Sequence, residues 1–188
     1  MHAKNYESFL DETRIVLAVD HGRNGNTFFL AIFDQHEEVL TCPWVHYVHS
    51  YAITNLGEGK TDSKAAHAFW TQESYFRWLY NDLNETTEAQ IFKLGSDPSA
   101  TIDRSTIRHV FDELILTRDK VTPADLITAS YYAYAVGIKR DISKIKYILL
   151  ADSISLRTEP WSKGFSGRVI DYAARTYNNP VIIQLMRD

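Results

Sequence analysis

The sequence has little of several features, and each shortage excludes a class of protein. Its single cysteine, Cys42, excludes an intramolecular disulfide and a cysteine-based zinc cluster, and it fits a reducing compartment. No apolar run approaches the roughly 18 residues that a membrane helix needs. Positive charge is not in excess either, since the formal net charge is −4 at pH 7. The chain therefore lacks an overall basic field that would gather nucleic acid, and a nucleic-acid partner would need a local basic patch.

The rest of the composition is that of an ordinary globular protein. The chain has 188 residues, of which 45% are apolar and 23% charged. No internal repeat and no linker rich in proline, glycine or serine divides it. We therefore expect one domain over residues 1–188, located in the cytoplasm and not associated with a membrane.

Strand-like runs dominate the first part of the chain. Residues 14–20 form a continuous apolar run, which is typical of a strand buried on both faces. Two further runs, 27–33 and 39–47, follow after short polar segments and predict a three-stranded meander. Pro43 removes a ladder donor, so the third strand is expected at a sheet edge. Later strands are predicted at residues 89–94, 144–151 and 181–186.

Helical spacing of apolar residues appears later in the chain. Residues 48–60 read as a loop, and Thr122 followed by a proline indicates a capped helix start. The predicted helices are 63–83, 101–117, 122–137 and about 167–177. The fold class is therefore α/β, with a mixed sheet of five to six strands flanked by helices, and we expect the first five strands in the order 3-2-1-4-5.

Three apolar runs end in an aspartate. These residues are Asp20, Asp97 and Asp152. Carboxylates gathered at one sheet edge are suited to Mg²⁺, which prefers oxygen ligands. The alternative is that each aspartate caps a local turn by accepting backbone N–H groups, which is the commoner role of aspartate after a strand.

Two polar segments have both a functional and a structural interpretation. Residues 21–26 contain two glycines and could cradle a phosphate, as in nucleotide binding by sugar-kinase-like folds, although the Asn24-Gly25 pair favours a hairpin turn. Residues 161–168 carry cations, hydroxyls and aromatics before a predicted helix and could bind a phosphate, and a capping loop is the simpler interpretation.

His46 and His49, three apart in an extended segment, would point to opposite faces, so zinc is not expected.

The predicted order of elements over residues 14–177 resembles the ribonuclease H-like superfamily, in which three antiparallel strands precede alternating helices and strands. The amino-acid sequence of residues 16–22 and 28–34 is similar to the opening hairpin of that superfamily, whose first strand ends in an aspartate. The resemblance implies further acids at the end of the fourth strand and on a late helix, where Asp97 and Asp171 fall. It also implies an acid on the first helix, where Glu73 stands.

These observations together predict a metal-dependent nuclease or phosphodiesterase of ribonuclease H-like type. In it Asp20, Asp97 and Asp171 would hold Mg²⁺ or Mn²⁺, with Glu73 as a fourth candidate. Lys163 and Arg168 would contact backbone phosphates of a nucleic acid. The alternative is a non-enzymatic binding or inhibitor module that keeps the fold, has no working metal site and binds a protein partner.

Overall fold

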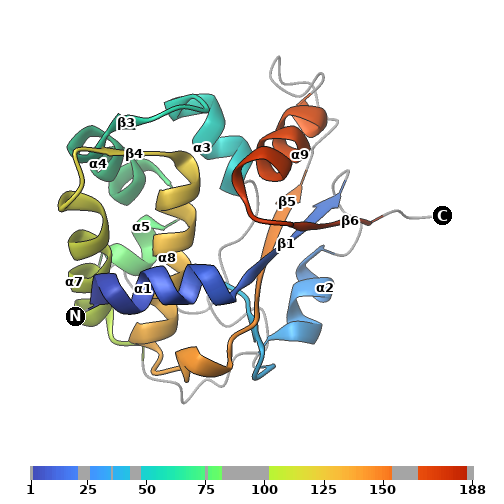
Figure 1. The fold of residues 1–188 in the computed structure, drawn as a ribbon, viewed down its shortest axis with the longest axis horizontal. Helices are drawn as coiled ribbons and strands as arrows, with labels where there is room; N and C mark the ends of the chain where they lie inside the picture. The colour runs from blue at the N-terminus through green and yellow to red at the C-terminus, as the bar shows by residue number, and fades with distance from the viewer. Residues whose placement is uncertain are drawn as a thin grey trace.

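The computed structural model describes residues 2–20, 26–34, 36–42, 48–74, 76–81, 102–153 and 165–185 (Figure 1). In chain order the elements are α1 (His2–Glu12), β1 (Arg14–Asp20), α2 (Asn26–Phe33), β2 (Val39–Leu40), α3 (Val48–Leu56), β3 (Thr61–Asp62), α4 (Ser63–Glu73), α5 (Arg77–Tyr80), α7 (Arg104–Leu116), β4 (Lys120–Val121), α8 (Pro123–Gly137), the 3-10 helix η2 (Ile142–Lys144), β5 (Tyr147–Ser153), α9 (Phe165–Thr176) and β6 (Val181–Leu185). The α/β class expected from the sequence is confirmed.

The central feature is a four-stranded sheet in the order β2-β5-β1-β6, and all of its pairings are parallel. β1 pairs with β5 along its whole length, from Arg14 opposite Tyr147 to Asp20 opposite Ser153. The apolar runs of β1 and β5 are almost entirely buried, as the sequence indicated for strands covered on both faces. A separate two-stranded antiparallel sheet joins β3 to β4.

The expected meander and the strand order 3-2-1-4-5 are wrong. Residues 27–33 lie in helix α2, and the third predicted strand is described only as β2, which pairs in parallel with β5. The neighbours of β1 are β5 and β6, and the strand predicted at 89–94 lies outside the described residues. Periodicity cannot separate a short apolar helix from a strand, and parallel strands of one sheet need crossover connections, such as the one that α2 supplies between β1 and β2.

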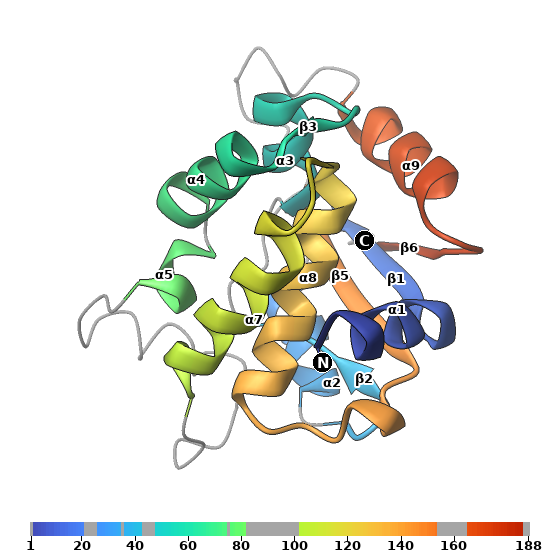
Figure 2. The same ribbon diagram turned by 60° about the vertical axis from the view of Figure 1, so that its left-hand side comes forward.

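Helix α8 lies at the centre of the helical layer, beside α7 (Figure 2). It is buried on nearly every side, because most of its residues are alanine, tyrosine and other apolar types. The residues expected to face inward, Leu126, Ala129, Ser130 and Ala133, are buried, and Val136 is half-buried. This helix was predicted from sequence over residues 122–137, and the structure confirms it.

Two helical predictions need correction. The loop expected at 48–60 contains helix α3, and the single helix expected at 63–83 is broken after Glu73. The break lies at Ser74, which is extended and whose hydroxyl accepts a hydrogen bond from the Phe76 N–H at 3.0 Å. Such local bonds from serine to the backbone compete with continuation of a helix. Helices α7 and α9 lie close to the predicted ranges.

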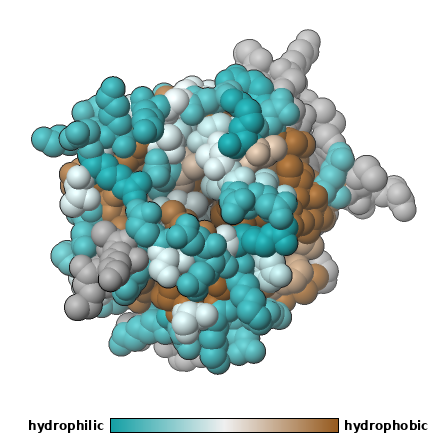
Figure 3. All heavy atoms as spheres, viewed as in Figure 1, coloured by the Kyte–Doolittle hydropathy of each residue, from teal (hydrophilic) through white to brown (hydrophobic). Residues whose placement is uncertain are grey.

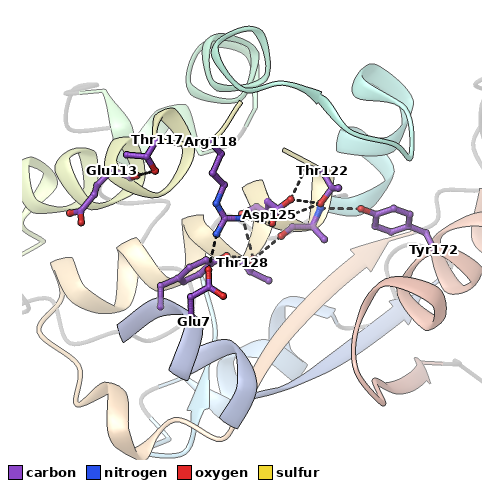
Figure 4. Close-up of polar contacts among 10 residues, drawn as sticks. Glu7, Glu113, Thr117, Arg118, Thr122, Asp125, Thr128 and Tyr172 are labelled. Carbon is purple, nitrogen blue, oxygen red and sulfur yellow. Dashed lines mark hydrogen bonds and ion pairs between the residues drawn. The ribbon is translucent and has the colours of Figure 1, made fainter. Parts of the chain in front are cut away.

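A polar network ties α1 and α9 to the start of α8 (Figure 4). The Arg118 guanidinium contacts the carboxylates of Glu7 at 3.2 Å and Asp125 at 2.9 Å. On the other side of α8, the Tyr172 hydroxyl accepts a hydrogen bond from the Ala124 N–H at 3.0 Å. These contacts fix the helical layer that packs on the sheet.

The surface is mostly polar, with apolar atoms interspersed on the face seen in Figure 3. Large apolar side chains are exposed at Ile32, Leu116 and Ile182. Among the helices of the described ranges, none has both the length and the apolar character needed to cross a membrane.

Candidate functional site at the carboxyl edge of the sheet

The carboxyl ends of β1 and β5 meet at one edge of the sheet. The two strands are adjacent, parallel and in register, so Asp20 ends β1 opposite Ser153, one residue beyond the pair Val19 and Asp152. From this edge the chain continues after β1 to helix α2, which begins at Asn26. Open parallel sheets bind ligands in the crevice outside the carboxyl ends of their strands, so the groups gathered there are the first candidates for a site.

Asp152 is a fully buried carboxylate near the end of β5. Its Oδ2 accepts hydrogen bonds from the backbone N–H groups of His49 at 2.8 Å and Ser50 at 3.4 Å. Its Oδ1 accepts a hydrogen bond from the Ser50 hydroxyl. These donors lie in the first turn of α3, so Asp152 caps that helix from 103 residues away in the chain. The negative charge also lies at the positive end of the helix dipole.

The His49 ring connects this carboxylate to a phenol. Its Nδ1 lies 3.2 Å from Oδ2 of Asp152, and its Nε2 lies 2.9 Å from the Tyr177 hydroxyl. A neutral imidazole that donates its Nδ1–H to Asp152 and accepts the Tyr177 O–H satisfies all of these contacts. Burial raises the pKa of the Tyr177 phenol well above its ordinary value, which keeps its proton in place.

The arrangement is a buried relay from Asp152 through His49 to Tyr177, and solvent does not reach its first two members. Asp152 is buried, and both of its carboxylate oxygens accept hydrogen bonds from α3. Its chemical role is to hold α3 and the carboxyl end of β5 in a fixed relation. Asp152 therefore caps a helix that is distant in the chain, and not the local turn that the sequence suggested.

The candidate metal ligands are not brought together within the described residues. Glu73 is exposed at the end of α4, where its backbone carbonyl accepts the Tyr51 hydroxyl at 3.0 Å, and Asp171 is exposed on α9. In Figures 1 and 2, α4 and α9 lie apart. Asp20 is placed only by its backbone at the end of β1, and Asp97 lies outside the described residues.

The two predicted phosphate contacts have different outcomes. Lys163 lies outside the described residues. Arg168 is exposed on α9, where its guanidinium contacts the Glu58 carboxylate at 3.0 Å, and Arg175 contacts the same carboxylate at 2.8 Å. These bonds lower the pKa of Glu58. Arg168 therefore joins α9 to the loop after α3.

A site for the proposed pair of divalent ions needs several acidic side chains close together. Across the part of the chain that the structure describes, no three histidine, cysteine, aspartate or glutamate side chains gather to hold a metal ion. Glu73 and Asp171 are exposed on different helices, and the Asp20 side chain and Asp97 lie outside the described part, so the two-metal site stays a prediction.

Sequence reasoning missed the roles of His49, Ser50 and Tyr177. In the sequence, His49 was noted only for its spacing from His46. That spacing was interpreted on the assumption that the segment is extended. His49 contacts Asp152 because the start of α3 lies beside the end of β5. These two segments are distant in the chain. Comparisons of the chain with models of known families, with curated proteins and with solved structures found no match.

Proposed function

We propose that this chain binds a phosphate-bearing ligand at the carboxyl edge of its parallel sheet, at the connection from β1 to α2. The observation that carries the proposal is that residues 26–33 form a helix directly after an interior parallel strand. The hairpin interpretation of residues 21–26 required a strand there. Without that strand, the phosphate-cradling alternative is the better supported of the two.

The chemistry of this connection suits an anion. The first N–H groups of a helix have no partner within the helix and carry partial positive charge, so they favour a phosphate. The five residues between β1 and α2 include two glycines, which allow close approach of a backbone, and the cation Arg23. The connection lacks the lysine of a Walker motif, so the proposal rests on its position and its composition.

Calorimetric titration of the full chain with ATP and with a short DNA oligonucleotide, each with Mg²⁺, tests the proposal. Loss of one arginine contact to phosphate costs about 1.5–3 kcal/mol, so Arg23→Ala should weaken binding about tenfold or more. Arg175→Ala is the matched control, because Arg175 lies in the last turn of α9 and pairs with Glu58. No binding of either ligand, or equal weakening by both variants, would reject the proposal.

A second candidate is metal-dependent cleavage of a phosphodiester at the same edge, the nuclease activity that the resemblance to ribonuclease H-like proteins implies. Asp20 favours it, because this acid ends the interior strand β1 where a bound phosphate would lie. The other ligands predicted from the sequence are Asp97, which lies outside the described residues, and Asp171 on α9. We expect Asp20→Asn to abolish cleavage supported by Mg²⁺ or Mn²⁺ while retaining ligand binding.

The same variant separates this activity from a binding or inhibitor module. Thermal stability is measured with and without Mg²⁺ for wild type and Asp20→Asn. A wild-type chain that Mg²⁺ stabilises and a variant that it does not would support a metal site at Asp20. A destabilised variant, with neither protein responding to the metal, would assign Asp20 a turn-capping role and end the nuclease proposal.

A further inference from the structure

A second polar cluster lies away from the sheet edge, where α4, α5 and α7 meet. It consists of the imidazole of His67, the phenol of Tyr80 and the carboxylate of Asp112. His67 Nε2 lies 2.7 Å from Asp112 Oδ1, the Tyr80 hydroxyl lies 2.8 Å from the same oxygen, and the hydroxyl lies 3.4 Å from Nε2. Three donor atoms from three helices thus form a closed triangle.

The size of this triangle matches the ligands of one small cation. Ligands bound at about 2.0–2.1 Å are separated by about 3.3 Å in tetrahedral and about 2.9 Å in octahedral geometry. The three separations in the cluster cover this range, so one point can lie at bonding distance from all three atoms. We propose that His67, Tyr80 and Asp112 form a site for a single transition-metal cation of high charge, with Fe³⁺ as the best match.

The donor set selects the class of metal. Imidazole nitrogen binds iron, copper, nickel and zinc, whereas carboxylate and phenolate oxygens are hard donors that favour a highly charged ion. The Tyr80 phenol must lose its proton to bind a metal as a phenolate, and a strong Lewis acid takes the place of that proton. Binding then forms a metal–oxygen bond to Tyr80 and releases the phenol proton to the buffer.

The surroundings hold the three groups in place and leave the site open to solvent. Phe111 packs against the rings of both His67 and Tyr80, with centroids 5.6 and 6.2 Å away. Arg108 donates from Nη1 to the Tyr80 backbone carbonyl at 3.1 Å, which fixes α5 on α7. The side chain of His67 is 14% exposed and that of Asp112 is 36% exposed, so an ion and its remaining water ligands can reach the cluster.

The alternative is that the cluster is only a hydrogen-bonded clasp between helices. A clasp needs no metal and has no spectroscopic signature. Titration of the full chain with ferric nitrilotriacetate separates the two, because phenolate bound to Fe³⁺ gives a charge-transfer band in the visible range. We expect the wild-type chain to develop this band up to one equivalent of iron.

Variants assign the band to the cluster. Tyr80→Phe should lose it, and His67→Gln and Asp112→Asn should weaken iron binding by about tenfold or more. The matched controls are Tyr51→Phe, which changes a tyrosine on α3, and His109→Gln, which changes a 75% exposed histidine on α7, and both should retain the band.

Circular dichroism shows whether each variant is folded. If Tyr80→Phe does not fold, the iron affinity of Asp112→Asn tests the proposal in its place. The proposal is overturned if the wild-type chain shows no band. It is also overturned if the band persists in Tyr80→Phe, or if Asp112→Asn binds iron with undiminished affinity.

Discussion

At the scale of single residues, a buried polar network joins the end of β5 to the start of α3. Asp152 accepts four contacts from two consecutive residues of α3, and the His49 ring passes the network on to Tyr177. The sequence indicated that an aspartate ends this strand. It could not indicate the partners, because they lie 102 and 103 residues away and hydrogen bonding at that distance is set by the fold.

Removal of the Asp152 carboxylate should be among the most destabilising single changes in the chain. Asp152→Ala leaves the Ser50 hydroxyl and the first N–H groups of α3 buried without an acceptor, so we expect a loss of about 3–5 kcal/mol. Urea unfolding measures it. The control Asp171→Ala removes an exposed aspartate and should change stability by about 0.5 kcal/mol or less. Equal effects of the two variants would show that the buried network contributes little.

At the scale of elements, the sequence was informative where a segment is long or capped and ambiguous where it is short and apolar. Helix α8 and strands β1 and β5 were predicted near their observed bounds. Residues 27–33 were predicted wrongly, because six apolar residues in a row after Thr27 fit a short helix as well as a strand. Helix α3 was missed because its cap, Asp152, comes from β5 and not from the local sequence.

The capping box of α8 is local, and this explains why the sequence revealed it. The Thr122 hydroxyl accepts a hydrogen bond from the Asp125 N–H at 3.2 Å, and the Asp125 carboxylate accepts one from the Thr122 N–H at 2.7 Å. Thr122→Ala should cost about 1 kcal/mol, and Thr122→Ser should cost less because it retains the hydroxyl. Urea unfolding curves compare them. An unchanged midpoint in Thr122→Ala would reject the cap.

The close packing of α8 on α7 depends on Gly137. A Cβ atom at this position would lie 2.3 Å from Cγ1 of Ile107 and 3.0 Å from the Asp103 carbonyl oxygen. Gly137→Ala should therefore destabilise the chain by about 1–3 kcal/mol, as overpacking does. The matched control is Gly59→Ala, since a Cβ atom there meets nothing within 4 Å. Differential scanning calorimetry should show a lower midpoint for Gly137→Ala alone, and equal midpoints would contradict the packing argument.

At the scale of the whole molecule, a helical layer rich in tyrosine packs on a parallel sheet. Burial raises the pKa of the phenols of Tyr6, Tyr131 and Tyr177. The sequence showed eleven tyrosines, but which of them are buried depends on how α1, α8 and α9 pack together. Because these phenols are buried, the free energy of unfolding should depend on pH in the alkaline range.

Stability should be insensitive to these tyrosines below about pH 10 and should fall above it. The sign follows from the raised pKa values: above pH 10 the unfolded chain releases phenol protons that the folded chain retains, so unfolding becomes more favourable. Urea midpoints measured at increasing pH test this. Tyr6→Phe should reduce the slope, because it removes one such proton, and a midpoint that stays constant above pH 10 would contradict the burial.

The central claim is that the carboxyl edge of the parallel sheet binds a phosphate-bearing ligand, and mapping the bound ligand on the folded chain tests it most directly. Amide chemical shifts of the labelled protein are recorded during titration with ATP and Mg²⁺, and then with the DNA oligonucleotide. We expect saturable shifts concentrated at Val19 and Asp20, at Asn26 and at the residues between them, and no shifts at the far end of α9 near Arg175. Shifts scattered over the surface, or confined to helices away from this edge, would contradict it.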